Sequence, residues 1–487
     1  MILAIDQGTT GTTALLIDKD IHIIDKVTVD FPQIFPQSGW VEHNLNDIWQ
    51  STLLAIQKLL EKTKINPKKI DAIGITNQRE TTCVWNQKTG KPLHNAIVWQ
   101  CRRSASFCNK LKKEGLNPFF QKKTGLLLDA YFSGTKINWL LKNVSKTKEK
   151  NAVFGTIDSF LISKLTNNEV HITDVSNASR TLLMNIKTLE WDDELCKILK
   201  IPKDKLPHIK SNCEIYGKTK NVAILPDGIP ISSAVGDQQA ALFGQACFKE
   251  NEAKCTYGTG SFFLLNTGKK PVFSKNNLLT TVAWHMKNKT TYALEGSVFI
   301  AGAAVQWLRD GLKIIRSSKE IEELAKKVPT SEEVVFVPAL TGLGAPYWNQ
   351  DARGAFYGLT RGTTQSHIAR ATLEAIAFQN YDLVKTMEKD TKKTISILRV
   401  DGGASANNLL MNFQAGLLNI PLSRPESLES TARGAALLAG LAIGYWNDLK
   451  EIAKKSKTAT LFKPKMKEKE RKQHLSKWHK AIQRTLT

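Results

Sequence analysis

The chain opens on a loop whose residue types suit phosphate binding. Residues 3–18 read LAIDQGTTGTTALLID: an apolar run, one carboxylate, a cluster of Gly and Thr, and a second apolar run. Backbone N–H groups that converge in such a turn can hold phosphate oxygens, while glycine admits a close approach and threonine hydroxyls add donors. No P-loop lysine follows, and a single Gly-rich turn is more often a plain hairpin turn. Asp6, directly before the loop, is a candidate ligand for a Mg²⁺ ion that accompanies the phosphates.

Two further Gly-rich turns favour phosphate binding over a plain hairpin. Residues 258–260 lie within EAKCTYGTGSFFLLNTG, and residues 402–403 lie within ILRVDGGASANN. Each follows a strand-like apolar segment, as the first loop does. Three such turns in two similar halves suit a nucleotide held between two lobes, because the phosphate donors can then come from both sides.

Charged residues also follow two other strand-like segments. Arg79 and Glu80 end IDAIGITNQRE, and Asp237 stands between IPISSAV and the helix-forming QQAALFGQ. Active sites in α/β sheets collect at such strand ends. A carboxylate there can act as a general base that takes the proton of an attacking hydroxyl group. The alternative for Asp237 is a helix N-cap, a role that asparagine would fill about as well.

The elements that must position these residues form two α/β halves. Residues 2–5, 13–18 and 21–31 predict a three-stranded meander, and the helix that follows has Asn46 as its expected N-cap. With 487 residues the chain exceeds the size of about 250–300 residues at which single cores stop growing. We predict two domains, 1–244 and 245–487, with a cleft between them, because no flexible linker separates the halves.

Composition argues against several classes of protein. The apolar segment 434–446 is shorter than the roughly 20 residues that a membrane span needs, so it predicts a buried helix and no membrane insertion. Asp6 interrupts what would be the apolar part of a signal peptide, which favours a cytoplasmic location. The seven cysteines are scattered without C-x-x-C pairs, which favours reduced, mostly buried thiols over disulfides or zinc ligands.

The net charge of +23 raises the question of a nucleic-acid partner. Lysines are spread along the chain and are dense only after residue 462, where Leu475, Trp478 and Ile482 indicate an amphipathic helix. We therefore expect a solvated basic surface and no binding of nucleic acid.

The order of these motifs resembles the superfamily of actin, the heat-shock chaperone ATPases and the sugar kinases, in which two ribonuclease-H-like lobes hold ATP between them. Within it the chain is similar to the FGGY carbohydrate kinases, above all to their glycerol-phosphorylating members, from residue 2 to about 446. The resemblance is carried by DQGTTGTT, GITNQRETTCVWNQKTGKPLHNAIVWQCRR, YFSGTKINWLLKN, TDVSNASRTLLMNI, GDQQAALFGQ, YGTGSFF, LTGLGAPYW, GAFYGLTRGTTQSHIARATLE and RVDGGASANN.

The resemblance implies ATP-dependent phosphorylation of glycerol to sn-glycerol 3-phosphate in the junction of two actin-like lobes, with a homodimer or homotetramer as the expected assembly. Another polyol or a ketose is the alternative substrate. An actin-like or chaperone-like protein driven by ATP is the alternative of a different class, but it would need a peptide-binding or polymer-forming part, and only a basic tail follows Trp446. A silent scaffold is disfavoured by the presence of both Asp6 and Asp237.

The resemblance also assigns site residues, one by one. A triol presents hydroxyls that both donate and accept, which suits charged and amide partners. The implied glycerol-binding residues are Arg79, Glu80, Tyr131, Asp237 and Gln238, with Trp99 and Phe262 against the carbon chain and Thr9 beside them, and Asp237 is the implied catalytic base. The implied ATP-binding residues are Thr9, Thr10, Gly11, Thr259, Gly302, Gln306, Gly403 and Asn407, and the implied Mg²⁺ ligands are Asp6 and Asp237.

Two departures from the family pattern bear on phosphate binding and on regulation. Thr13 stands where many bacterial members carry an arginine, so the resemblance implies no cationic contact from this position to the transferred phosphate. The segment 220–238 lacks the Gly-rich, Arg-bearing loop through which some bacterial members bind fructose 1,6-bisphosphate. Inhibition by that sugar is therefore not expected.

Overall fold

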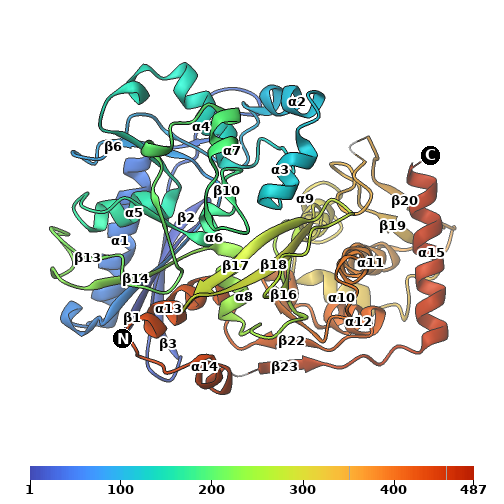
Figure 1. Ribbon diagram of the computed structural model, residues 1–487. Coiled ribbons are helices and arrows are strands. Elements are labelled where there is room, and N and C mark those ends of the chain that lie inside the picture. Colours follow the sequence, from blue (N-terminus) through green and yellow to red (C-terminus); the bar gives the residue numbers. More distant parts are fainter. Residues whose placement is uncertain (350, 457, 487) are drawn as a thin grey trace.

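The computed structural model describes residues 1–349, 351–456 and 458–486, and it folds into two α/β lobes, coloured blue to green and yellow to red in Figure 1. The first sheet has the order β13-β14-β5-β1-β2-β3 and the second the order β17-β18-β16-β15-β21-β22-β23. The strands of the first sheet are β1 (Ile2–Gln7), β2 (Gly11–Ile17), β3 (Ile23–Asp30), β5 (Ala72–Asn77), β13 (Gly217–Lys218) and β14 (Pro230–Gly236). Those of the second are β15 (Glu252–Tyr257), β16 (Ser261–Gly268), β17 (Leu279–Met286), β18 (Lys289–Val298), β21 (Ile397–Asp401), β22 (Leu422–Pro425) and β23 (Thr458–Phe462).

Helices and short strands complete the two lobes. The helices are α1 (Leu45–Thr63), α2 (Ala105–Lys113), α3 (Asn117–Thr124), α4 (Ser133–Asn143), α5 (Ile157–Leu165), α6 (Val175–Ala178), α7 (Asp193–Leu199), α8 (Asp237–Gly244), α9 (Gly302–Asp310), α10 (Glu320–Lys326), α11 (Gln365–Thr391), α12 (Asn408–Leu418), α13 (Ser430–Ala442), α14 (Leu449–Lys455) and α15 (Glu468–Leu486). The short strands are β4 (Glu42–His43), β6 (Cys83–Asn86), β7 (Ala96–Ile97), β8 (Ala152–Gly155), β9 (Ile172–Asp174), β10 (Met184–Asn185), β11 (Glu190–Trp191), β12 (His208–Lys210), β19 (Val335–Val337) and β20 (Ala355–Tyr357), and the 3₁₀ turns are η1 (Pro67–Lys69), η2 (Ser145–Lys148), η3 (Lys203–Lys205) and η4 (Gly403–Ala406).

The two sheets repeat one topology. In the first, β1, β2 and β3 form an antiparallel meander, and β5 and β14 extend it in parallel on the other side of β1. In the second, β15, β16 and β18 are antiparallel neighbours, with β17 between β16 and β18 in the chain, and β21 and β22 extend the sheet in parallel beside β15. The predicted two-lobed α/β fold built from two similar units is therefore confirmed.

Helices α1 and α13 cover the two faces of the first sheet. Apolar residues of α1 are buried against one face, but its N-cap is Asn44, whose side chain accepts the Asn46 N–H, so the expectation of Asn46 as the cap was wrong. On the other face Ala435 of α13 accepts a 2.7 Å hydrogen bond from the Ser233 hydroxyl. A Cβ at Gly74 would lie 2.4 Å from the same carbonyl, so this close approach requires glycine.

The structure also describes the apolar segment 434–446 and the cysteines. The apolar segment at 434–446 is largely helical, although α13 begins earlier, at Ser430, and ends at Ala442. All seven cysteines are free thiols, and six are buried. Among the described residues, none of the helices combines the length and apolarity that crossing a bilayer requires.

The basic C-terminal segment forms α15, which runs along the edge of the second lobe (Figure 1). Its apolar side is anchored by Trp478, which is 0% exposed, stacks on Phe378 at 5.2 Å and donates from Nε1 to Asp382 Oδ2 at 2.6 Å. Ile482 is buried beside it, as the amphipathic pattern predicted. The tail is therefore part of the core of the second lobe.

Trp478→Ala is expected to lower the free energy of unfolding by about 3–5 kcal/mol, because it removes a fully buried aromatic side chain and a donor to a buried carboxylate. Urea unfolding followed by circular dichroism measures the change. Lys480→Ala, at an exposed position of the same helix, should stay within about 0.5 kcal/mol of the parent. Equal stabilities of the two variants would contradict the anchoring role.

Candidate active site

Three parallel neighbouring strands bring the candidate acids and bases to one edge of the first sheet. Asp6 of β1 is in register with Thr76 of β5, and Asn77 of β5 is in register with Gly236 of β14. Arg79 and Glu80 follow β5 directly, and Asp237 follows β14. Because the carboxyl ends of parallel strands meet at one edge, these side chains converge there.

The turn after β5 is strained and firmly held. Glu80 has φ of 60°, and the Thr81 N–H donates to the Arg79 carbonyl at 2.7 Å, which makes a γ-turn of the rarer, positive-φ kind. The Glu80 carbonyl accepts hydrogen bonds from Ser133 Oγ at 3.0 Å and Lys136 Nζ at 3.4 Å. Burial lowers the pKa of Lys136 to about 8. Such strain persists only where the surroundings fix it, and it is concentrated at functional sites.

A continuous chain of contacts joins five of the predicted glycerol-binding residues. Arg79 Nε lies 3.1 Å from Asp237 Oδ1, and Arg79 Nη2 lies 3.5 Å from the Tyr131 hydroxyl. The Tyr131 ring packs edge-on against Trp99, at 5.6 Å between centroids, and Trp99 Nε1 donates to Thr9 Oγ1 at 3.0 Å. The residues expected for the polyol thus contact the first Gly-rich loop, through Trp99 and Thr9.

The second sheet supplies the opposite side of this site. Lys254 of β15 is fully buried, donates from Nζ to Gln238 Oε1 and lies 2.9 Å from Thr256 Oγ1. Burial lowers the pKa of Lys254. Phe262 of β16 is in register with Thr256, so it shares the sheet face that contacts Gln238.

Besides Lys254, two further charged residues at this site, Arg180 and Glu295, were missed by sequence reasoning. Arg180 Nε donates to Glu80 Oε1 at 2.6 Å, and Arg180 Nη2 donates to Glu295 Oε1 at 2.9 Å. Glu295 also binds Arg79, with 2.5 Å between Nη1 and Oε2. The available signal was a lone charge inside an apolar segment, as in YALEGSV for Glu295 and NASRTLL for Arg180.

Two of the three Gly-rich turns are tight hairpin turns with exposed tips. The first is closed by Gly8 N–H to Gly11 O and the second by Gly258 N–H to Gly260 O, each at 2.9 Å. Their tips, which include Thr10 and Thr259, are exposed. In the third turn Gly402 has φ of 84° and no room for a Cβ, whereas a Cβ at Gly403 would meet no described atom within 4 Å.

Two of the remaining predicted nucleotide residues, Gly302 and Asn407, have local structural roles that need no ligand. Gly302 begins α9 and donates to Gly258 O at 3.0 Å, and a Cβ there would lie 2.5 Å from that oxygen. Gln306 lies on the same helix and is exposed. Asn407 caps α12 by accepting the Leu410 N–H at 2.8 Å. Packing alone therefore requires glycine at 302, and the nucleotide contacts of these residues stay predictions.

Asp6 and Asp237 form an acidic pair that suits a cation. Burial, then the charge of Asp237 and then that of Glu429, raise the pKa of Asp6 to about 8. Within the described parts of the chain no group of three or more His, Cys, Asp or Glu side chains could hold a metal ion. Two carboxylates completed by phosphate oxygens and water fit the way proteins bind Mg²⁺.

Thr13, the position at which many bacterial members carry an arginine, is in register with Asp6 on the neighbouring strand. Its hydroxyl is hydrogen-bonded to the hydroxyl of Thr28 at 2.8 Å.

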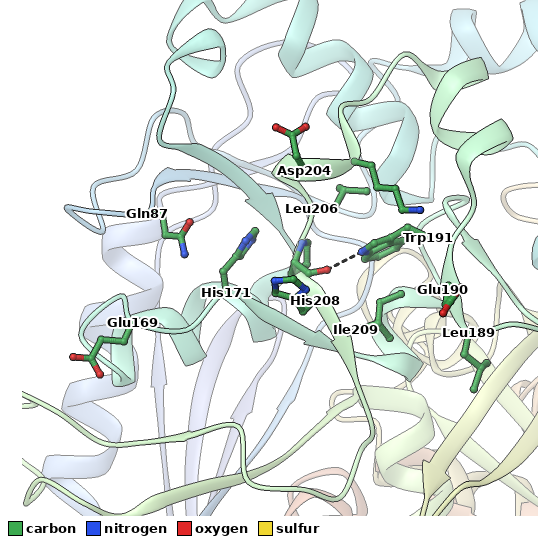
Figure 2. Close-up of a pocket in the computed structure, with 12 residues that line it drawn as sticks. Gln87, Glu169, His171, Leu189, Glu190, Trp191, Asp204, Leu206, His208 and Ile209 are labelled. Atoms are coloured by element: carbon green, nitrogen blue, oxygen red, sulfur yellow. Dashed lines mark hydrogen bonds between the residues drawn. The ribbon is translucent and has the colours of Figure 1, made fainter.

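A separate hollow of about 790 Å³ opens on the first lobe and is shown in Figure 2. His171, His208 and Trp191 line it, and Trp191 Nε1 donates to the Pro207 carbonyl at 2.7 Å. Burial lowers the pKa of His171 to about 4, so this imidazole is neutral at neutral pH. The described lining includes none of the residues predicted for glycerol, ATP or Mg²⁺, which separates the hollow from the strand-end site.

Two family models cover most of the chain. The N-terminal domain of the FGGY family of carbohydrate kinases matches residues 1–244, and the C-terminal domain of the same family matches residues 253–443. The chain belongs to this family.

Relatives of this FGGY kinase match it over its whole length. A glycerol kinase of Bdellovibrio bacteriovorus is 55% identical, with 99% of each chain covered, and glycerol kinase 2 of Thermotoga maritima is 53% identical, with 100% of this chain and 98% of the other covered. Among solved structures, Plasmodium falciparum glycerol kinase with ADP matches with a TM-score of 0.95 at 41% identity, covering 100% of this chain and 98% of the other. The similarity therefore extends over both lobes.

Proposed function

We propose that this FGGY kinase transfers the γ-phosphoryl group of ATP to glycerol, giving sn-glycerol 3-phosphate and ADP. The observation that carries the proposal is the contact chain from Asp237 through Arg79, Tyr131 and Trp99 to Thr9, which joins a polar, hydroxyl-binding cluster to a phosphate loop. Its full-length relatives named glycerol kinase support the same substrate.

A glycerol hydroxyl would bind where the contacts made by Arg79 are weakest. Arg79 Nη2 contacts the Tyr131 hydroxyl at 3.5 Å, the longest of the hydrogen bonds from its guanidinium group. A glycerol hydroxyl that takes this place would accept a charge-assisted hydrogen bond and could still donate to Tyr131 or Glu80. The partly exposed Trp99 offers an apolar edge to the carbon chain.

Asp237 is the proposed general base. Its Oδ1 accepts the Gln238 N–H at 2.6 Å and lies 3.1 Å from Arg79 Nε, which holds the carboxylate and leaves Oδ2 for the substrate. The terminal hydroxyl gives its proton to Oδ2 as its oxygen bonds to the γ-phosphorus. The bond between that phosphorus and the oxygen bridging to the β-phosphate breaks, and ADP leaves.

The residues near the phosphates would hold the phosphoryl group in place for transfer and would not themselves react. Backbone N–H groups of the two hairpin loops would hold the phosphate oxygens, and Asp6 with Asp237 would hold Mg²⁺. Bound Mg²⁺ neutralises the negative charge of the phosphates.

The division at residue 244, the cytoplasmic location and a homodimer or homotetramer stay predictions, as do the individual site roles.

An assay of ADP formation tests the substrate. With glycerol, ribulose, xylulose and gluconate as acceptors, we expect kcat/KM for glycerol to exceed the others by at least about tenfold, because one unmatched charge-assisted hydrogen bond costs that much. ADP formation with no acceptor is the baseline. A ketose that matches glycerol would favour the alternative FGGY kinase, and an unchanged baseline with every acceptor would contradict polyol phosphorylation.

A further inference from the structure

A buried group of four charged side chains lies behind the polyol site and spans both lobes. Arg79, Glu80 and Arg180 come from the first lobe, and Glu295 comes from β18 of the second sheet. Their side chains are 2%, 1%, 0% and 5% exposed, respectively. The two positive and two negative charges balance. Four charged side chains can be buried together only when they are paired in this way.

Glu295 is the second-lobe member of this group, and it holds both arginines. Its Oε2 lies 2.5 Å from Arg79 Nη1, and its Oε1 accepts from Arg79 Nη2 at 3.1 Å and from Arg180 Nη2 at 2.9 Å. Burial alone would raise the pKa of Glu295, but Arg180 and Arg79 hold it at about 2. The carboxylate is therefore ionised and keeps two like-charged guanidinium groups side by side.

The orientation of Arg79 depends on this bidentate contact. The guanidinium plane is fixed by Glu295 on Nη1 and Nη2, which turns Nε toward Asp237 and the free side of Nη2 toward Tyr131. Arg180, held at the same carboxylate, donates to Glu80 Oε1. Glu295 thus reaches Arg79 and Glu80 of the polyol site without lying among the residues predicted to touch glycerol.

We infer that Glu295 is a positioning residue through which the second lobe completes the glycerol site: it sets Arg79 directly and Glu80 through Arg180. The inference rests on the proposed glycerol kinase function. Without the Glu295 charge the group carries a net charge of +1, and the two arginines repel each other instead of sharing a partner. Glycerol recognition then weakens, while the Gly-rich loops, which share none of these contacts, keep their geometry.

Steady-state kinetics of Glu295→Gln test the inference. We expect the glycerol KM to rise at least about tenfold, the effect of one lost charge-assisted contact, with the ATP KM and the Kd of ADP within about twofold of the parent. Glu295→Asp keeps the negative charge on a shorter side chain, so its glycerol KM should lie between that of the parent and that of Glu295→Gln. A merely structural role would not separate the two substrates in this way.

A matched control is Glu374→Gln, which alters another buried glutamate of the second lobe. Glu374 pairs with Arg370 at 2.8 Å and accepts from Ser331 at 2.7 Å, away from the strand-end site. It should leave the glycerol KM unchanged. Thermal unfolding of each variant shows that it is folded, and if Glu295→Gln does not fold, Glu295→Asp must still show a raised glycerol KM.

The outcomes distinguish the inference from the proposed function. A parent protein that forms no ADP in response to glycerol would overturn the proposed function. An active parent whose Glu295→Gln or Glu295→Asp variant keeps a normal glycerol KM, or loses glycerol and ATP affinity equally, would overturn the positioning role alone.

Discussion

Asp237→Asn is expected to lower kcat by at least about a hundredfold, because a positioned general base contributes roughly 10²–10⁴-fold and an amide cannot take the hydroxyl proton. The variant should fold and bind ADP normally, since the amide oxygen can still accept the Gln238 N–H that Asp237 Oδ1 accepts at 2.6 Å. Measurements of kcat, the melting temperature and the Kd of ADP on one preparation give all three results.

The competing explanation treats Asp237 as a helix-capping residue. The N-cap of α8 is Gly236, so the alternative of Asp237 as the N-cap was wrong. What is left of that explanation is a local role for Asp237 in the first turn of the helix, which asparagine would fill about as well. Asp448→Asn is the matched control, because Asp448 caps α14 through the Lys450 and Glu451 N–H groups, far along the chain from the site. Near-normal turnover in both variants would remove Asp237 from the mechanism.

Features determined by neighbouring residues could be predicted from the sequence. The hairpins around Gly8 and Gly258 follow from apolar runs interrupted by glycine, and both are present. The same local reasoning erred by two residues at α1, where Asn44 and Asn46 are both suitable caps. Which of two nearby asparagines begins the helix depends on how the preceding chain enters it, and the residue pattern does not contain that information.

The charged group behind the site was not predictable, because its contacts join distant parts of the chain. Arg79 and Glu295 are 216 positions apart, and Glu80 and Arg180 are 100 apart. A lone buried charge indicates that a partner exists but not which residue it is. Gly302 is the converse case: the family resemblance implied a nucleotide contact, and the close approach of α9 to Gly258 O already requires glycine there.

Arg79 is the residue whose replacement should most weaken glycerol binding. Arg79→Lys is a sharper test than Arg79→Ala, because alanine would leave Glu295 buried with one arginine fewer and would destabilise the protein. Lysine keeps the positive charge but lacks the planar guanidinium group, so it cannot donate hydrogen bonds to Glu295, Asp237 and a glycerol hydroxyl at the same time. We expect the glycerol KM to rise about a hundredfold, and the ATP KM to stay within about threefold, since the lost contacts touch one substrate.

The matched control for this change is Arg103→Lys. Arg103 is also buried, pairs with Glu42 at 2.7 Å and stacks over Trp40. Its replacement by lysine therefore removes a planar guanidinium group from a buried ion pair that belongs to the fold and not to the predicted glycerol site. It should lower the melting temperature without raising the glycerol KM selectively. Because Arg79 also lies 3.1 Å from Asp237, its replacement should reduce kcat as well as glycerol affinity, whereas Glu295→Gln acts mainly on affinity. Equal effects of Arg79→Lys on the KM of both substrates would mean that the guanidinium supports the fold and does not read the polyol.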